Sequence, residues 1–97
     1  MPLFVYVGRD GASGLELRPE HRPAHLDHIA ALGARVRFGG PLIDSDGKPC
    51  GSLVMLEAAD LASARDAAES DPYLVKGIFE SVEVFETKQV APPPDES

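Results

Sequence analysis

Residues 21–28 carry the side chains best suited to proton transfer, because three histidines and one arginine fall within this stretch. A histidine side chain titrates near neutral pH and can therefore act as a general acid or base. If the stretch is helical, a rotation of about 100° per residue directs His25 and Arg22 into the same arc as Ile29. The pattern predicts that an imidazole and a guanidinium point towards the protein interior.

An inward guanidinium requires a partner, because burying its charge is costly unless a carboxylate or carbonyl groups meet it. Asp71 is the leading candidate for a carboxylate near Arg22 and His25. A structural interpretation stays open, in which His25 satisfies one hydrogen bond at the edge of the core and Arg22 extends to water. Asp71-Pro72-Tyr73 is also typical of an ordinary helix-ending turn, with the Tyr73 hydroxyl at the surface.

Two further patterns argue against metal and phosphate chemistry. His21 and His28, taken together with His25, do not show the spacing of a known metal motif with a third, acidic ligand. The run Gly39-Gly40-Pro41 lacks the Lys and Ser/Thr of a phosphate-binding loop and does not precede a helix. We expect this run to bend at a sheet edge or to let the backbone approach a ligand, and we expect neither a metal nor another cofactor.

Length and charge restrict the class of protein. A chain of 97 residues is predicted to form one domain with a thin core, which a second copy would help to complete, so a homodimer is expected. The formal net charge of -7 has the wrong sign for nucleic acid or an anionic membrane surface. With Cys50 as the single cysteine and no apolar segment long enough for a signal peptide or a membrane span, a cytoplasmic protein is expected.

Hydrophobic periodicity predicts an α+β domain in the order β-α-β-β-α-β. The simplest closure is a four-stranded antiparallel sheet with both helices on one face. The turn at 44–47 predicts a hairpin between the second and third strands, and Asp60 is a good N-cap for the second helix. The domain is assigned to residues 1–87, and the Pro-rich, acidic tail 88–97 is expected to be disordered. The predicted strands are Leu3–Val7, Ala34–Phe38, Ser52–Glu57 and Phe79–Phe85, and the predicted helices are Pro19–Leu32 and Leu61–Ser70.

Several short motifs, each weak alone, together resemble the YciI-like family of YCII-related domains in their order and spacing. The resemblance covers about residues 3–86 and omits only the tail. The matching residues are Arg22, His25-Leu26, Gly40-Pro41-Leu42, Gly47, Gly51-Ser52, Asp71-Pro72-Tyr73 and Phe79.

The resemblance implies a ferredoxin-like fold that dimerises as an α/β barrel, with a small-molecule pocket on each subunit. It implies that His25 and Asp71 are the catalytic pair and that Arg22, Ser52 and Tyr73 line the pocket. One departure is the segment Arg9–Leu17, which is longer and richer in glycine than the minimal family pattern and is expected to be a loop at the pocket mouth.

If Asp71 accepts a hydrogen bond from one nitrogen of His25, the other nitrogen is left to move a proton. The predicted function is therefore cofactor-independent acid/base chemistry on a small organic molecule, of an isomerase, lyase or dehalogenase-like type. The alternative is a non-catalytic small-ligand-binding or accessory module, since fold alone does not decide function. A third hypothesis is an oxygenase of the kind found among other dimeric α/β barrels.

Overall fold

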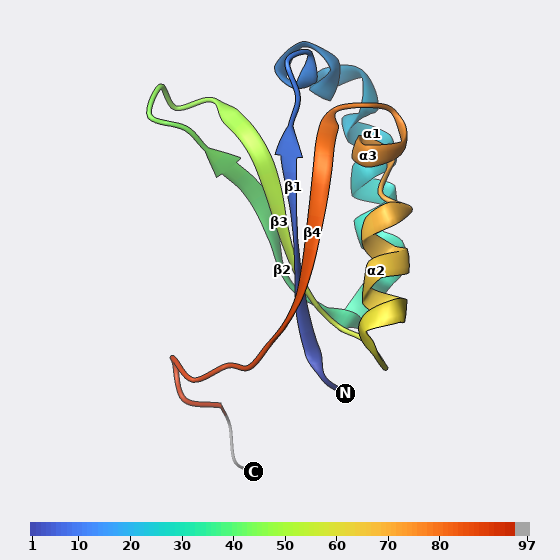
Figure 1. The fold of residues 1–97 in the computed structure, drawn as a ribbon, viewed down its shortest axis with the longest axis vertical. Helices are drawn as coiled ribbons and strands as arrows, with labels where there is room; N and C mark the ends of the chain where they lie inside the picture. The colour runs from blue at the N-terminus through green and yellow to red at the C-terminus, as the bar shows by residue number, and fades with distance from the viewer. Residues whose placement is uncertain (95–97) are drawn as a thin grey trace.

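The computed structural model describes residues 1–94, which form one antiparallel sheet covered on one face by helices (Figure 1). The strands lie in the order β2-β3-β1-β4, so that β1 is central as an N-terminal strand of this fold should be. This arrangement confirms the predicted ferredoxin-like α+β fold. The elements are β1 (Leu3–Asp10), α1 (Gly14–Leu32), the 3-10 turn η1 (Gly33–Arg35), β2 (Val36–Ile43), β3 (Pro49–Glu57), α2 (Leu61–Glu69), α3 (Pro72–Val75) and β4 (Phe79–Thr87).

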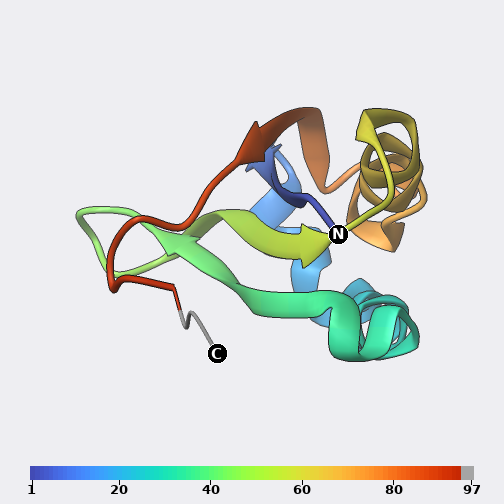
Figure 2. The same ribbon diagram turned by 90° about the horizontal axis from the view of Figure 1, so that it is seen from below.

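The core lies between the sheet and its helices (Figure 2). Alternate residues of the two central strands face it, with Phe4 and Tyr6 from β1 and Val54 and Leu56 from β3 almost fully buried. Ala64, Ala67 and Ala68 of α2 belong to the same cluster, and their small side chains let the helix approach the sheet closely. None of the helices within residues 1–94 lies on the opposite face of the sheet (Figure 1).

Local sequence accounts for the hairpin and for the start of α2. Asp44 accepts hydrogen bonds at Oδ1 from the backbone N–H groups of Asp46 and Lys48, at 2.8 and 3.0 Å, and Gly47 adopts a φ of 79°. Asp60 caps α2 as predicted, because its side chain accepts a hydrogen bond of 2.8 Å from Ser63 N–H.

Helix α1 begins at Gly14 and not at Pro19, which is the main correction to the sequence analysis. Pro19 and Pro23 both lie inside the helix, although each lacks the N–H that would continue its hydrogen-bond ladder. Tertiary contacts compensate, since Leu17 packs against the cluster around Phe79. The prediction that Arg9–Leu17 is a loop is therefore wrong: only residues 11–13 separate β1 from α1.

Two other boundaries differ from the predictions. Strand β2 does not end at Phe38 but continues through Gly39-Gly40-Pro41, which an edge strand tolerates because one side of its backbone is unpaired. Pro72 does not simply end α2, because it starts the short helix α3 with Asp71 as its N-cap.

Residues 88–94, the described part of the predicted tail, contain neither helix nor strand, and 95–97 lie outside the described residues. None of the helices in the described part of the chain has the length and apolar character needed to cross a membrane.

Candidate functional site

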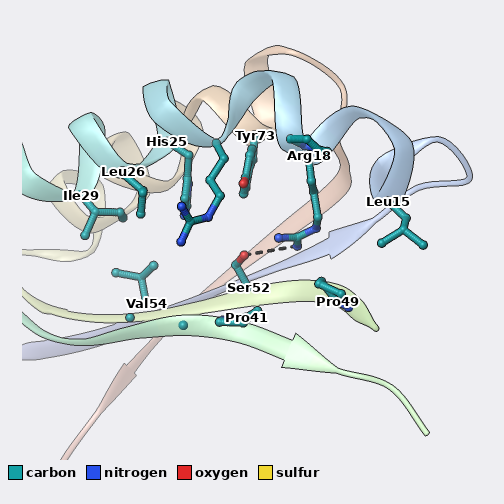
Figure 3. Close-up of a pocket in the computed structure, with 14 residues that line it drawn as sticks. Leu15, Arg18, His25, Leu26, Ile29, Pro41, Pro49, Ser52, Val54 and Tyr73 are labelled. Atoms are coloured by element: carbon teal, nitrogen blue, oxygen red, sulfur yellow. Dashed lines mark hydrogen bonds between the residues drawn. The ribbon is translucent and has the colours of Figure 1, made fainter. Parts of the chain in front are cut away.

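A cavity of about 520 Å³ lies between α1 and the half of the sheet formed by β2 and β3 (Figure 3). Side chains of α1 approach it from one side, and Ser52 and Val54 of β3 form the opposite wall. All five residues predicted to belong to a site are at or directly behind this wall. The lining residues are Leu15, Arg18, Pro19, Arg22, His25, Leu26, Ile29, Gly39, Gly40, Pro41, Pro49, Ser52, Val54 and Tyr73.

His25 and Asp71 are in direct contact. The Nδ1 atom of His25 lies 2.8 Å from Oδ1 of Asp71, although 46 residues separate them in the chain. The Asp71 side chain is fully buried, whereas that of His25 keeps 12% exposure and lines the cavity. The imidazole therefore stands between a buried carboxylate and the space that a ligand would occupy.

Three donors hold the Asp71 carboxylate. Besides His25, Tyr6 donates from its hydroxyl to Oδ2 at 2.7 Å, and the backbone N–H of Tyr73 donates to Oδ1 at 2.9 Å. Burial alone would raise the pKa of Asp71, but the hydrogen bonds from His25, Tyr6 and Tyr73 outweigh it and hold that pKa below its ordinary value. The pKa of Tyr6 is raised by its burial and by the Asp71 charge, so its hydroxyl stays a donor.

An ionised Asp71 determines the tautomer of neutral His25. Because the carboxylate can only accept, Nδ1 must carry the proton and Nε2 is left with a lone pair. Both nitrogens carry protons once the ring is charged, and the adjacent carboxylate then stabilises the imidazolium. The arrangement supplies one proton acceptor at the cavity wall.

Tyr73 fixes the orientation of the imidazole. The two rings are stacked, with centroids 4.0 Å apart and an interplanar angle of 5°, and Phe79 meets Tyr73 edge-on at 5.6 Å. The guanidinium carbon of Arg18 lies 4.9 Å from the Tyr73 centroid, and because His25 occupies one face of the ring, Arg18 must cover the other. Figure 3 shows Tyr73 between these two side chains.

Arg18 is a site residue that the sequence analysis missed. It forms two hydrogen bonds to Asp10, from Nε at 2.6 Å and from Nη2 at 2.8 Å, and Nη2 also donates to the Gly51 carbonyl at 2.8 Å and to Ser52 Oγ at 3.4 Å. Burial would lower the pKa of Arg18, but the Asp10 carboxylate raises it above the ordinary value. On a helix starting at Gly14, Arg18 is two turns before His25 and shares its face, which the assumed start at Pro19 concealed.

Arg22 differs from its prediction. It is exposed, and among residues 1–94 it has no hydrogen-bond or ion-pair partner, so it is not the buried arginine and does not pair with Asp71. Asp71 already accepts three hydrogen bonds and lies behind His25. The buried arginine of the site is Arg18, and its carboxylate partner is Asp10. Arg22 nevertheless lines the cavity, as do Tyr73 and the buried Ser52.

The two histidines that were excluded from the predicted site also lie outside the cavity wall. Nε2 of His28 lies 2.9 Å from the carbonyl oxygen of Ala67, so that this side chain connects α1 with α2. His21 has its nearest acidic group, Glu20, at 3.8 Å.

Solved structures with this fold include one enzyme of similar sequence. The 5-chloro-2-hydroxyhydroquinone dehydrochlorinase TftG from Burkholderia phenoliruptrix AC1100, in complex with 2,5-dihydroxybenzoquinone, matches with a TM-score of 0.80 and 27% identity. The match covers 89% of this chain and 93% of that one. An antibiotic biosynthesis monooxygenase matches with a TM-score of 0.56 and 11% identity over 93% of this chain and 99% of that one, which shows the fold alone.

Sequence comparisons agree with the resemblance found from the motifs. Protein YciI of Escherichia coli O6:H1 is 35% identical over 96 residues, covering 91% of this chain and 98% of that protein. The family model of the YCII-related domain matches residues 2–88. The chain therefore belongs to the family of YCII-related domain proteins.

Proposed function

We propose that this protein is a cofactor-independent enzyme that moves protons on a small organic molecule, with His25 as the acid/base residue and Asp71 as its support. One observation carries the proposal: a fully buried carboxylate lies 2.8 Å from the inner nitrogen of an imidazole that lines a cavity. A positioned acid/base group of this kind contributes about 10²–10⁴-fold to a rate.

The reaction class that fits best is dehalogenase-like elimination from a hydroxylated ring. Two features support it: the largely apolar lining suits a planar ring, and the similar structure TftG is a dehydrochlorinase with a bound quinone. TftG is 27% identical to this chain, so its reaction suggests the class of reaction to test here. Nε2 of His25 would be the proton acceptor that such a reaction needs.

A single imidazole is sufficient for the elimination. Nε2 of His25 takes a proton from one ring hydroxyl while the electron pair moves into the ring, and the imidazolium returns a proton to the carbon that bears chlorine. Loss of a second hydroxyl proton then expels chloride with the bonding pair. The ring leaves as a quinone, the net change is the loss of one proton and one chloride, and no external oxidant is needed.

Chloride release from 5-chloro-2-hydroxyhydroquinone tests the proposal, with His25→Ala compared with the matched control His21→Ala. We expect His25→Ala to lower kcat by about 10²–10⁴-fold while the fold is kept, because Nε2 is the proton acceptor. His21→Ala should behave as the wild type, since His21 lies outside the cavity lining. Full turnover by His25→Ala would exclude the proposed role, and binding of the ring without turnover by the wild type would favour the non-catalytic module.

We also propose that the protein is a homodimer joined through the uncovered face of the sheet. On that face Val5 lies opposite both Met55 and Phe85, and Phe38 lies opposite Met55, so an apolar row crosses all four strands. Phe38 and Phe85 are 59% and 52% exposed, although large aromatic side chains are usually covered. A second copy packing by the same face would bury the row against itself, as a two-fold interface requires.

Light scattering at micromolar concentration tests the dimer. The wild type should show twice the mass of the chain, and Phe85→Glu should reduce it to one chain, because a charge would then be buried in the centre of the interface. Val75→Glu is the matched control, since Val75 is 64% exposed but belongs to α3 on the helical side. A wild-type mass equal to one chain would refute the dimer.

A further inference from the structure

We propose that the cavity contains a subsite for an ionised oxygen of the ligand, formed by the guanidinium of Arg22 and Nη1 of Arg18. The ligand class is then a planar ring with an acidic oxygen, of phenolate or carboxylate type, placed away from the oxygen that His25 deprotonates. This inference rests on the proposed function, because it specifies the substrate of the same cavity.

The charge balance of the cavity wall is the first argument. Among the described residues, the lining includes two arginines and no Asp or Glu. The two nearest carboxylates, Asp10 and Asp71, lie behind the wall and are occupied by Arg18 and His25. With Asp10 neutralising Arg18, Arg22 is the cavity-lining arginine that has no carboxylate partner among residues 1–94.

Arg18 contributes a donor as well as a charge. Its hydrogen bonds to Asp10, Gly51 and Ser52 use Nε and Nη2, so Nη1 takes no part in them. Arg18 lines the cavity beside Tyr73, and Nη1 is the nitrogen that these bonds leave for a ligand oxygen. The bonds to Asp10 and Gly51 hold the guanidinium in place, which means that a ligand does not have to order it.

Arg18 and Arg22 both influence the part of the cavity beside Tyr73. Arg18, Arg22 and Tyr73 line the same cavity. Burial raises the pKa of the Tyr73 phenol, and the charges of Arg18 and Arg22 both oppose that rise. Arg18 also stacks on the ring at 4.9 Å. An oxygen bound beside Tyr73 would therefore meet two guanidinium groups, and charge-assisted hydrogen bonds are stronger than neutral ones.

The rest of the cavity suits a flat apolar body. Ile29 and Val54 face it, and Gly39 presents no side chain; a Cβ built there has no atom within 4 Å. A ring lying across this surface would place one edge at His25 and another at the arginine end. Neutral rings would gain the apolar contacts but not the ionic ones, so the subsite would select for charge.

Calorimetric titration of three probes tests the subsite. 2,5-Dihydroxybenzoquinone supplies ionised ring oxygens, 4-hydroxybenzoate supplies a carboxylate, and hydroquinone is a neutral ring. We expect Arg22→Gln to weaken the binding of at least one anionic probe about tenfold and to change hydroquinone binding less than twofold. The matched control Arg65→Gln, at an exposed position of α2 outside the cavity lining, should bind every probe as the wild type does.

The same titrations in a His25→Ala background separate the subsite from the proposed catalysis. If the subsite exists, Arg22→Gln weakens anion binding there too, whether or not the wild type turns over any substrate. The anionic probe that responds distinguishes the phenolate from the carboxylate. Anion affinity unchanged by Arg22→Gln, no anion binding by the wild type, or an equal loss for hydroquinone would each overturn the subsite.

Discussion

Two buried carboxylates meet basic side chains from the same face of α1, and the two pairs differ in what they can do. Asp10 is paired with Arg18, and Asp71 is paired with His25 seven residues further along the helix. Tyr73 lies between the basic partners, stacked on one and covered by the other (Figure 3). Arginine keeps its proton at any ordinary pH, whereas histidine exchanges its proton near neutrality.

The difference shows why a buried ion pair does not by itself indicate a catalytic site. Arg18 is held by two bonds to Asp10 and one to Gly51, so it ties the end of β1 to α1 and β3. The Asp71 carboxylate is held by the Tyr6 hydroxyl, the Tyr73 backbone N–H and the His25 imidazole. The first pair is fixed and positions the second, which can change its proton.

The largest expected effect is a loss of turnover when the His25–Asp71 pair is changed. Asp71→Asn should lower kcat by about 10²–10⁴-fold, because an amide does not stabilise an imidazolium by charge and does not enforce the Nδ1–H tautomer. Asp66→Asn, on the exposed surface of α2, is the matched control and should keep wild-type turnover. Chloride release measured on folded protein, with circular dichroism as the check, decides the point; turnover by Asp71→Asn within threefold of wild type would contradict it.

The next largest effect is a loss of stability when the Arg18–Asp10 pair is changed. Arg18→Met keeps most of the side-chain volume but leaves the Asp10 carboxylate without its counter-charge, so the free energy of unfolding should fall by about 3–5 kcal/mol. Arg9→Met removes an arginine that is 62% exposed and paired with Glu83, and it should cost about 0–1 kcal/mol. Urea unfolding of the two variants measures the contrast. Equal losses would show that Arg18 is no more structural than a surface arginine.

Sequence alone predicted the features that depend on neighbouring residues. The strands, the hairpin turn and the Asp60 cap follow from local periodicity and side-chain chemistry, and the motif match placed His25 and Asp71 in one pocket. Arg18 was missed because Pro19 resembles a helix start, whereas the helix begins at Gly14, where tertiary contacts of Leu17 and Arg18 hold its first turns.

The Tyr6 hydroxyl was beyond sequence reasoning for a different reason. It donates to a carboxylate 65 residues away, and that contact depends on where α3 lies relative to β1. Whether Arg22 has a carboxylate partner also depends on tertiary contacts. A helical wheel shows which face a residue occupies, but not whether a neighbouring side chain has already taken the nearest carboxylate.

The smallest expected effect is on the pH dependence of stability, and it follows from the lowered pKa of Asp71. Because the pKa of Asp71 is lowered in the folded protein by its hydrogen bonds from His25, Tyr6 and Tyr73, which outweigh burial, the unfolded chain binds a proton more readily than the folded one. The resulting stability is present above the unfolded value of about 4 and is lost as the pH falls through the folded pKa. The free-energy difference between wild type and Asp71→Asn should therefore shrink below about pH 4. Urea unfolding from pH 7 down to pH 3 measures this difference, and a wild-type advantage that persisted unchanged into acid would show that the native state does not hold Asp71 ionised.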